Sequence, residues 1–191
     1  MGKVIVIQFV TLDGIVEDPD GSGGTPGGGW AFRFGPEAVA GDKFKLGPIL
    51  QSGVLLIGRS TWELFSRIWP NRTDEFSNAM NHIQKVVVSR SAPTLDAWSN
   101  SSVLDGELID GVARISRNRD VVVVGSTSVV HALAAADAVD EYRLLLFPVA
   151  LGAGERLFVA PVELQLTSTE TSSVAILACY ERTAPKSAEP V

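Results

Sequence analysis

The sequence predicts an α/β domain in three layers, in which a mainly parallel sheet is covered by helices on both faces. Five short runs of apolar, mostly β-branched residues are typical of strands buried on both sides. Helical patterns lie between most of these runs, and strands that alternate with helices form parallel sheets. The five predicted strands are residues 4–10, 54–57, 86–88, 121–124 and 142–147.

The helices follow from apolar residues at helical spacing, and the C-terminal strands from a different period. One predicted helix carries Leu104, Leu108, Val112 and Ile115 on one face, and another begins near Ser126. A third contains Trp62, Phe65 and Trp69 and ends at Pro70. Residues 162–167 alternate between apolar and polar, and 174–180 form a second run, which predicts an antiparallel hairpin at the sheet edge or a subunit interface.

Composition excludes several classes of protein. The 191 residues are 46% hydrophobic, which is too apolar for a disordered chain, and they suit one domain over 1–182 with a loose tail over 183–191. The formal net charge of −6 argues against nucleic acid or acidic membranes as partners. A single cysteine, Cys179, excludes an internal disulfide, and no metal site is expected. The longest apolar stretch is too short to span a bilayer, so we expect a cytoplasmic protein.

Polar residues and glycines follow each of the first four predicted strands. Because the carboxyl ends of parallel strands meet at one edge of a sheet, we expect these segments to lie together there, where open α/β sheets bind ligands. Two of them also open helices, whose free N–H groups favour an anion. Each segment alone could be structural only, because glycine often ends strands and Ser or Thr often caps helices in α/β proteins. The segments are residues 11–14, 58–61, 89–90 and 125–128.

These segments resemble those of the dihydrofolate reductase superfamily. The motif LIGRSTWE at 56–63 is similar to its strand-to-helix motif, and 86–90 and 121–126 are similar to its next two cofactor segments. The motifs FVTLDG at 9–14, DEYR at 140–143 and PVALGAG at 148–154 look more like one branch, the reductase domain of riboflavin biosynthesis and its stand-alone bacterial relatives. The resemblance covers about residues 3–180 and implies a dihydrofolate reductase-like fold.

The resemblance implies an enzyme that transfers a hydride from NADPH. It implies that the first helical turns after the second and fourth strands hold the cofactor phosphates, and that Ser89 and Arg90 hold the adenosine 2′-phosphate. A guanidinium and a hydroxyl are suited to a phosphate in that position. The predicted cofactor residues are Gly58, Arg59, Ser60, Thr61, Ser89, Arg90, Gly125, Ser126, Thr127 and Ser128.

The expected substrate is a pyrimidine- or pterin-like molecule, as for 5-amino-6-(5-phosphoribosylamino)uracil reductase. Asp13, at a strand end beside a glycine, is the candidate for touching substrate or delivering a proton, and an Asx-turn is the alternative for it. Trp30 and Phe34 are candidates for stacking on a substrate ring, with a hydrophobic plug as the alternative. The Gly-rich loop over residues 17–34 is expected to cover the substrate, and its Gly-rich piece at 21–29 is expected to be mobile.

Two other functions stay open at this point. One is a general reductase of another carbonyl or imine substrate on the same scaffold. Basic residues that could hold a substrate phosphate are few in the first third of the chain, so a substrate without a phosphate group is also open. The other is a cofactor- or small-molecule-binding protein without turnover. A homodimer is expected from the resemblance, and from the apolar run at 174–180, which would be a poor exposed edge.

Overall fold

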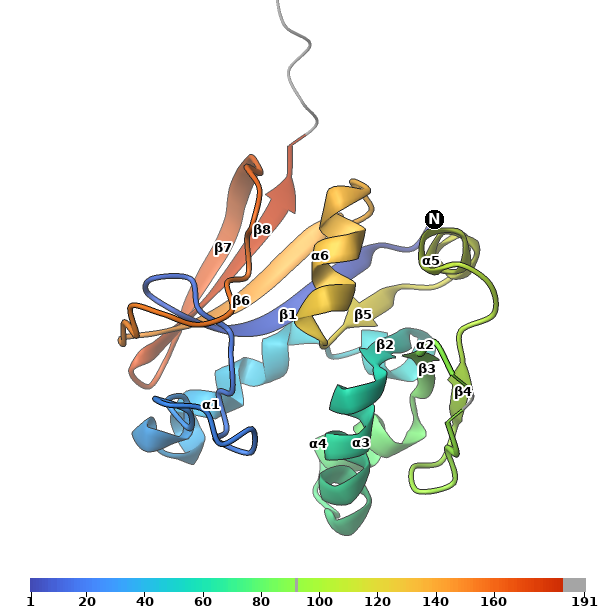
Figure 1. Cartoon of the computed structure of the whole chain (residues 1–191), viewed down its shortest axis with the longest axis horizontal. Helices are drawn as coiled ribbons and strands as arrows, with labels where there is room; N and C mark the ends of the chain where they lie inside the picture. The colour runs from blue at the N-terminus through green and yellow to red at the C-terminus, as the bar shows by residue number, and fades with distance from the viewer. Residues whose placement is uncertain (92, 184–191) are drawn as a thin grey trace, which may run out of the picture.

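Eight strands form one sheet in the computed structural model, which describes residues 1–91 and 93–183 (Figure 1). They are β1 (Val4–Thr11), β2 (Val54–Gly58), β3 (Gln84–Val88), β4 (Ser101–Val103), β5 (Val121–Val123), β6 (Glu141–Phe147), β7 (Leu164–Ser172) and β8 (Ala175–Arg182). Their order is β4-β3-β2-β5-β1-β6-β8-β7. The first six strands in this order are parallel, and β8 is antiparallel to both β6 and β7.

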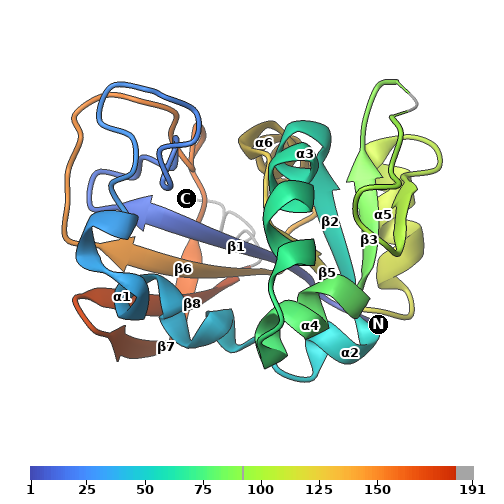
Figure 2. The ribbon, with the colours of Figure 1, turned by 90° about the horizontal axis from the view of Figure 1, so that it is seen from below.

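Helices cover both faces of the sheet, which confirms the predicted three layers (Figure 2). On one face lie α1 (Pro36–Ala40), α2 (Ile49–Ser52), α3 (Arg59–Ile68) and α4 (Glu75–His82), and on the other lie α5 (Leu108–Ser116) and α6 (Thr127–Ala135). Three short 3-10 turns, η1 (Phe32–Phe34), η2 (Gly41–Lys45) and η3 (Trp69–Asn71), complete the described helical segments. The last of these contains Pro70, where the sequence predicts that the preceding helix ends.

Two hydrophobic cores sit on either side of the strands, as the two-residue period of a strand requires. In β1, Ile5 and Ile7 pack toward α1–α4, whereas Val4 and Val6 pack toward α5 and α6. All of β2 and β5 is buried, which explains why these strands are continuous apolar runs in the sequence. The removal of these apolar side chains from water is what holds the helices on the sheet.

The C-terminal hairpin lies at the sheet edge as predicted, but its last strand is not the edge. The chain turns at Ser173 and Val174, and β8 inserts between β6 and β7. The outer strand is β7, whose side chains are mostly polar and exposed. Residues 176–180 are therefore paired through their backbone on both sides, so the argument from an exposed edge strand to a homodimer fails, although the side chains of Val174 and Ile176 are exposed. A homodimer stays a prediction.

Some elements differ from the sequence-based expectations. Strand β4 was not predicted, because its three residues are Ser101, Ser102 and Val103 and carry no apolar run. Strand β7 extends to Ser172, through part of the expected polar break, because an edge strand needs backbone pairing and not apolar side chains. Of the expected tail only Thr183 is described, and residues 184–191 lie outside the described part. Among the described residues, no helix is long and apolar enough to cross a membrane.

Candidate active site

The carboxyl ends of β2, β3 and β5 meet at one edge of the sheet, and β1 extends beyond them. Residues Val4–Val6 of β1 pair with Val121–Val123 of β5, whereas the pairing of β1 with β6 continues from Ile5 to Thr11. After Val123 the chain follows β2 instead, since Val124 N–H donates to the Leu56 carbonyl at 3.3 Å. The second half of β1 is thus left without a neighbour on its β5 side, at the position where α/β sheets bind ligands.

Two turns from distant parts of the chain touch each other at this edge. We call residues 58–61 and 125–128 the paired turns. The Gly58 N–H donates to the Gly125 carbonyl at 2.9 Å. A Cβ atom at Gly58 would lie 2.5 Å from Ser126 Oγ and 2.8 Å from its backbone nitrogen, so only glycine allows this approach. Gly125 has φ of +115°, and a Cβ atom there would lie 3.2 Å from Thr61 Oγ1.

Each of the paired turns opens a helix whose first N–H groups have no side-chain cap. Helix α3 starts after Gly58, which has no side chain to offer, and α6 starts after Ser126, whose hydroxyl does not cap it. The Ser126 hydroxyl instead hydrogen-bonds the Ser128 hydroxyl at 2.9 Å. By contrast, α4 is capped by the Asp74 side chain, which accepts from Ser77 N–H. Two uncapped helix starts in contact make a surface that favours an anion.

The end of β3 joins this surface through Arg59. The Arg59 guanidinium donates to Glu63 at 2.7 Å and to the Ser91 hydroxyl at 3.0 Å. Ser91 N–H donates in turn to the Ser89 hydroxyl at 3.3 Å, so the segment 89–91 lies beside the start of α3. Arg90 is exposed, and no hydrogen bond or ion pair is recorded for it within the described part of the chain. Ser91 was not predicted, although its place next to Ser89 and Arg90 was the available signal.

Asp13 lies at the end of β1, and its carboxylate is already engaged. One oxygen accepts from the Thr11 hydroxyl, and the other accepts from the N–H groups of Leu151 and Gly152 at 3.0 and 2.6 Å. The Thr11 hydroxyl and the Gly152 N–H lower the pKa of Asp13 to about 2. The group is therefore ionised at neutral pH, which disfavours it as a proton donor, and its contacts are those of a residue that joins two loops.

The Gly-rich loop is organised around one carboxylate. Asp18 accepts from Gly23 N–H at 2.7 Å, from Thr25 N–H at 2.9 Å and from the Thr25 hydroxyl at 3.0 Å. A Cβ atom at Gly28 would lie 2.2 Å from Asp18 Oδ2, so glycine is needed for the loop to close on this side chain. These contacts join the middle of the loop to one side chain near its start, and the mobility of the loop stays a prediction.

The aromatic residues after this loop divide into buried and accessible ones. Trp30 is fully buried, and its indole N–H donates to the Glu17 carbonyl at 2.8 Å. This burial corrects the prediction that Trp30 stacks on substrate, and it matches the alternative of a hydrophobic plug. Phe34 is half-buried and packs on Phe147. Phe32 is 49% exposed and meets Phe9 of β1 edge-on at 6.4 Å, so the accessible aromatic surface is Phe9 with Phe32.

The structure thus brings together Gly58, Arg59, Thr61, Gly125 and Ser126. The remaining predicted cofactor residues, Ser60, Ser89, Arg90, Thr127 and Ser128, lie in or beside the same turns and are half-buried or exposed. No cluster of three or more His, Cys, Asp or Glu side chains that could hold a metal ion occurs among the described residues.

The strand order and the paired turns at the carboxyl ends define a dihydrofolate reductase-like α/β domain. The chain belongs to the RibD C-terminal domain family, which matches residues 2–178. It is 24% identical over 185 residues to the uncharacterized protein YyaP of Bacillus subtilis (strain 168), covering 92% of each chain.

Solved structures of low sequence identity share the fold. A putative riboflavin biosynthesis protein from Shewanella sp. PV-4 has a TM-score of 0.73 at 17% identity, over 95% of this chain and 99% of that one. A pyrimidine reductase-like protein from Corynebacterium diphtheriae has a TM-score of 0.65 at 12% identity, over 96% and 92%. RibD from Acinetobacter baumannii has a TM-score of 0.67 at 16% identity, and the match covers 96% of this chain and 59% of that longer one.

Proposed function

We propose that the protein is an NADPH-dependent reductase of a pyrimidine- or pterin-like small molecule. The observation that carries the proposal is the contact between Gly58 and Ser126, which joins two uncapped helix starts at the open half of β1. Membership of the RibD C-terminal domain family supports the same reaction class. When bound, the nicotinamide cofactor supplies the hydride.

The residues at this edge fit a dinucleotide phosphate. The uncapped N–H groups of α3 and α6 would hold the diphosphate, because such groups are strong donors that have no intrahelical partner. Arg90 brings positive charge to the end of β3, Arg59, although paired with Glu63, reaches the same place through Ser91, and Ser89 and Ser91 add hydroxyl donors. This set suits a further phosphate on the adenosine ribose, so we expect NADPH to bind more tightly than NADH.

The substrate ring would lie beside Phe9 and Phe32, where the second half of β1 has no β5 neighbour. Phe32 is exposed, and Phe9 is half-buried with its ring stacked on Phe44, so the surface they leave suits a planar heteroaromatic ring. Asp13 would act here by fixing the loops on either side of the ring and not by giving up a proton. The Gly-rich loop, closed on Asp18, would limit water on the same side.

The contacts of three basic side chains in the first third of the chain favour a substrate without a phosphate group as the second candidate. Lys3, at the opposite end of β1 from this edge, pairs with Glu181 at 2.7 Å, and Lys45 pairs with Glu170 at 2.6 Å. The Arg33 guanidinium donates to the carbonyls of Gly27 and Gly28 at 3.1 and 2.9 Å. Each of these three cations has a partner within the protein, so recruiting one for a substrate phosphate would break an existing contact.

The cofactor is tested by thermal shift with NADPH and NADH separately. At a hundred times Kd, the bound cofactor should stabilise the protein by about 2.7 kcal/mol, which raises Tm by about 5–10 °C in a domain of this size. Arg90→Ala should weaken NADPH about tenfold or more and leave NADH unchanged, because it removes a charge-assisted hydrogen bond. The control is Arg117→Ala, an exposed cation at the end of α5. Equal affinities for both cofactors that do not change in Arg90→Ala would refute the proposal.

Turnover is tested by following NADPH absorbance with pteridines and aminopyrimidines, each with and without a phosphoribosyl group. Oxidation of NADPH by members of this panel supports a reductase, and the phosphorylated and plain pairs separate the two substrate candidates. NADPH binding with no oxidation across the panel would instead support a binding protein without turnover.

A further inference from the structure

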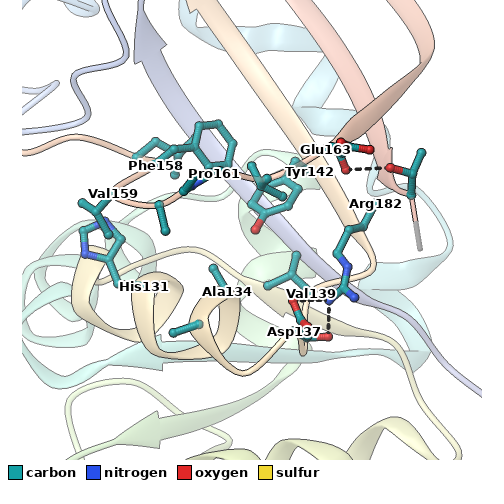
Figure 3. Close-up of a pocket in the computed structure, with 15 residues that line it drawn as sticks. His131, Ala134, Asp137, Val139, Tyr142, Phe158, Val159, Pro161, Glu163 and Arg182 are labelled. Carbon is teal, nitrogen blue, oxygen red and sulfur yellow. Dashed lines mark hydrogen bonds and ion pairs between the residues drawn. The ribbon is translucent and has the colours of Figure 1, made fainter. Parts of the chain in front are cut away.

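A cavity of about 400 Å³ lies on the far side of α6 from the paired turns. It opens between α6, the start of β6 and the irregular segment 157–163 (Figure 3). Ala134 and Ala135 on α6 have side chains too small to fill the space, and Phe158 and Pro161 form part of the opposite wall. The volume is within the range of small-molecule sites. None of the predicted cofactor or substrate residues lines it.

Tyr142 of β6 presents its hydroxyl to this cavity. The residue is only 1% exposed, and its ring is fixed edge-on against Phe158 at 5.3 Å between centroids. Its hydroxyl points into the cavity (Figure 3), and no hydrogen bond to it is recorded within the described part of the chain. The hydroxyl is thus available to a ligand, and one hydrogen bond to it would contribute about 0.5–1.5 kcal/mol. Burial also raises the pKa of Tyr142, so the hydroxyl is protonated at neutral pH and can both donate and accept.

Two of the three charged side chains around the cavity pair with each other. The Arg182 guanidinium pairs with the Asp137 carboxylate at 2.8 Å and also donates to its carbonyl at 2.7 Å. The His131 ring is hydrogen-bonded through Nε2 to the Arg156 carbonyl at 2.8 Å. Glu163 adds a carboxylate at the rim. Because Arg182 is already paired with Asp137 and Glu163 adds a second carboxylate, the lining disfavours an anionic ligand, and the apolar walls at Ala134 and Phe158 suit a neutral one.

We infer that this cavity is a second binding site, which takes a neutral and largely apolar ring compound whose single polar group hydrogen-bonds the Tyr142 hydroxyl. The apolar body of the ligand would pack between Ala134 and Phe158. The site is separate from the cofactor edge, although α6 reaches both. Its occupation therefore does not depend on whether the protein is a reductase.

The inference is tested with 2-naphthol as a neutral probe and 2-naphthoate as its anionic counterpart, by protein NMR on the full chain. We expect 2-naphthol to shift amide signals of α6 and of residues 157–163, and 2-naphthoate to bind more weakly. Tyr142→Phe should keep the melting temperature and weaken 2-naphthol about three- to tenfold, which corresponds to one hydrogen bond. Ala134→Leu should fill the cavity and abolish binding, whereas Ala132→Leu, at an exposed position of the same helix, should not.

Three results would overturn the site. They are the absence of 2-naphthol shifts in this region, binding that Ala134→Leu leaves intact, and a melting temperature that falls in Tyr142→Phe, since the hydroxyl would then have a structural partner. NADPH binding is measured on the same variants and is expected to match that of the wild type. Failure of this site is in that way distinguishable from failure of the proposed reductase function.

Discussion

Replacing Gly58 by alanine tests the paired turns directly. The added Cβ atom would lie 2.5 Å from Ser126 Oγ, 2.8 Å from Ser126 N and 3.0 Å from Ser126 Cβ. The hydroxyl could rotate away, but the backbone nitrogen could not, so the two turns must separate by several tenths of an ångström. Overpacking of this kind costs about 1–3 kcal/mol. In a domain of this size, that lowers Tm by about 3–10 °C.

The same variant should lose cofactor affinity beyond its loss of stability. Separating the turns moves one set of helix N–H groups away from the diphosphate, and losing one charge-assisted hydrogen bond corresponds to a factor of about ten to a hundred. Isothermal titration with NADPH, below the melting temperature of the variant, measures this factor. The control is Gly47→Ala, where φ is +32° and no atom lies within 4 Å of the new Cβ. It should lower Tm without changing NADPH affinity.

The two readouts separate the possible errors. If Gly58→Ala melts earlier but binds NADPH like the wild type, the turns touch as described but do not hold the phosphates. If neither Tm nor affinity changes, the contact between Gly58 and Ser126 itself is wrong.

Three further substitutions test other contacts. The pKa of Asp13 is lowered to about 2, so its contribution to stability is present above pH 4 and is lost as the pH falls toward 2. The free energy of unfolding of Asp13→Asn should therefore depend less steeply on pH between 4 and 2 than that of the wild type. The Lys85 ammonium is fully buried and donates to three carbonyls at the end of α4, so Lys85→Met should cost about 1–3 kcal/mol in urea unfolding at pH 7, unlike the exposed Arg117→Met. Burial lowers the pKa of Lys85 to about 8, so the stability of the wild type relative to that variant should rise between pH 8 and 10.5. Asp18→Ala should speed proteolysis within residues 17–34, whereas Asp20→Ala, which removes an acceptor only for Ser22, should not.

The central strands could be predicted from the sequence because burial on both faces demands an uninterrupted apolar run. Strand β4 could not, since its two serines and one valine carry no such pattern and it forms by pairing with β3. Strand order is a further limit. The apolar run at 174–180 indicates a strand. Whether β7 or β8 is the outer strand depends on the path of the hairpin, which cannot be predicted from the alternation of apolar and polar residues.

The candidate site divides in the same way. Glycines and hydroxyls at strand ends were predictable, because their place in the chain fixes their place on the sheet. The environments of individual side chains were not. Asp13 and Trp30 both sit where a ligand residue would be expected, yet one carboxylate is taken up by Thr11 and Gly152, and one indole is enclosed beneath the Gly-rich loop. Such contacts come from segments far away in the sequence.

The tight fit between Gly58 and Ser126 has a practical consequence for redesign. Neither of the paired turns can be exchanged alone, because a bulkier residue in one would collide with the other. The neighbouring stretch from Ser89 to Ser91 is tied to them only by the single hydroxyl contact of Arg59, among the hydrogen bonds recorded for the described residues. To alter cofactor preference, residues 89–91 can therefore be replaced while the paired turns are kept unchanged.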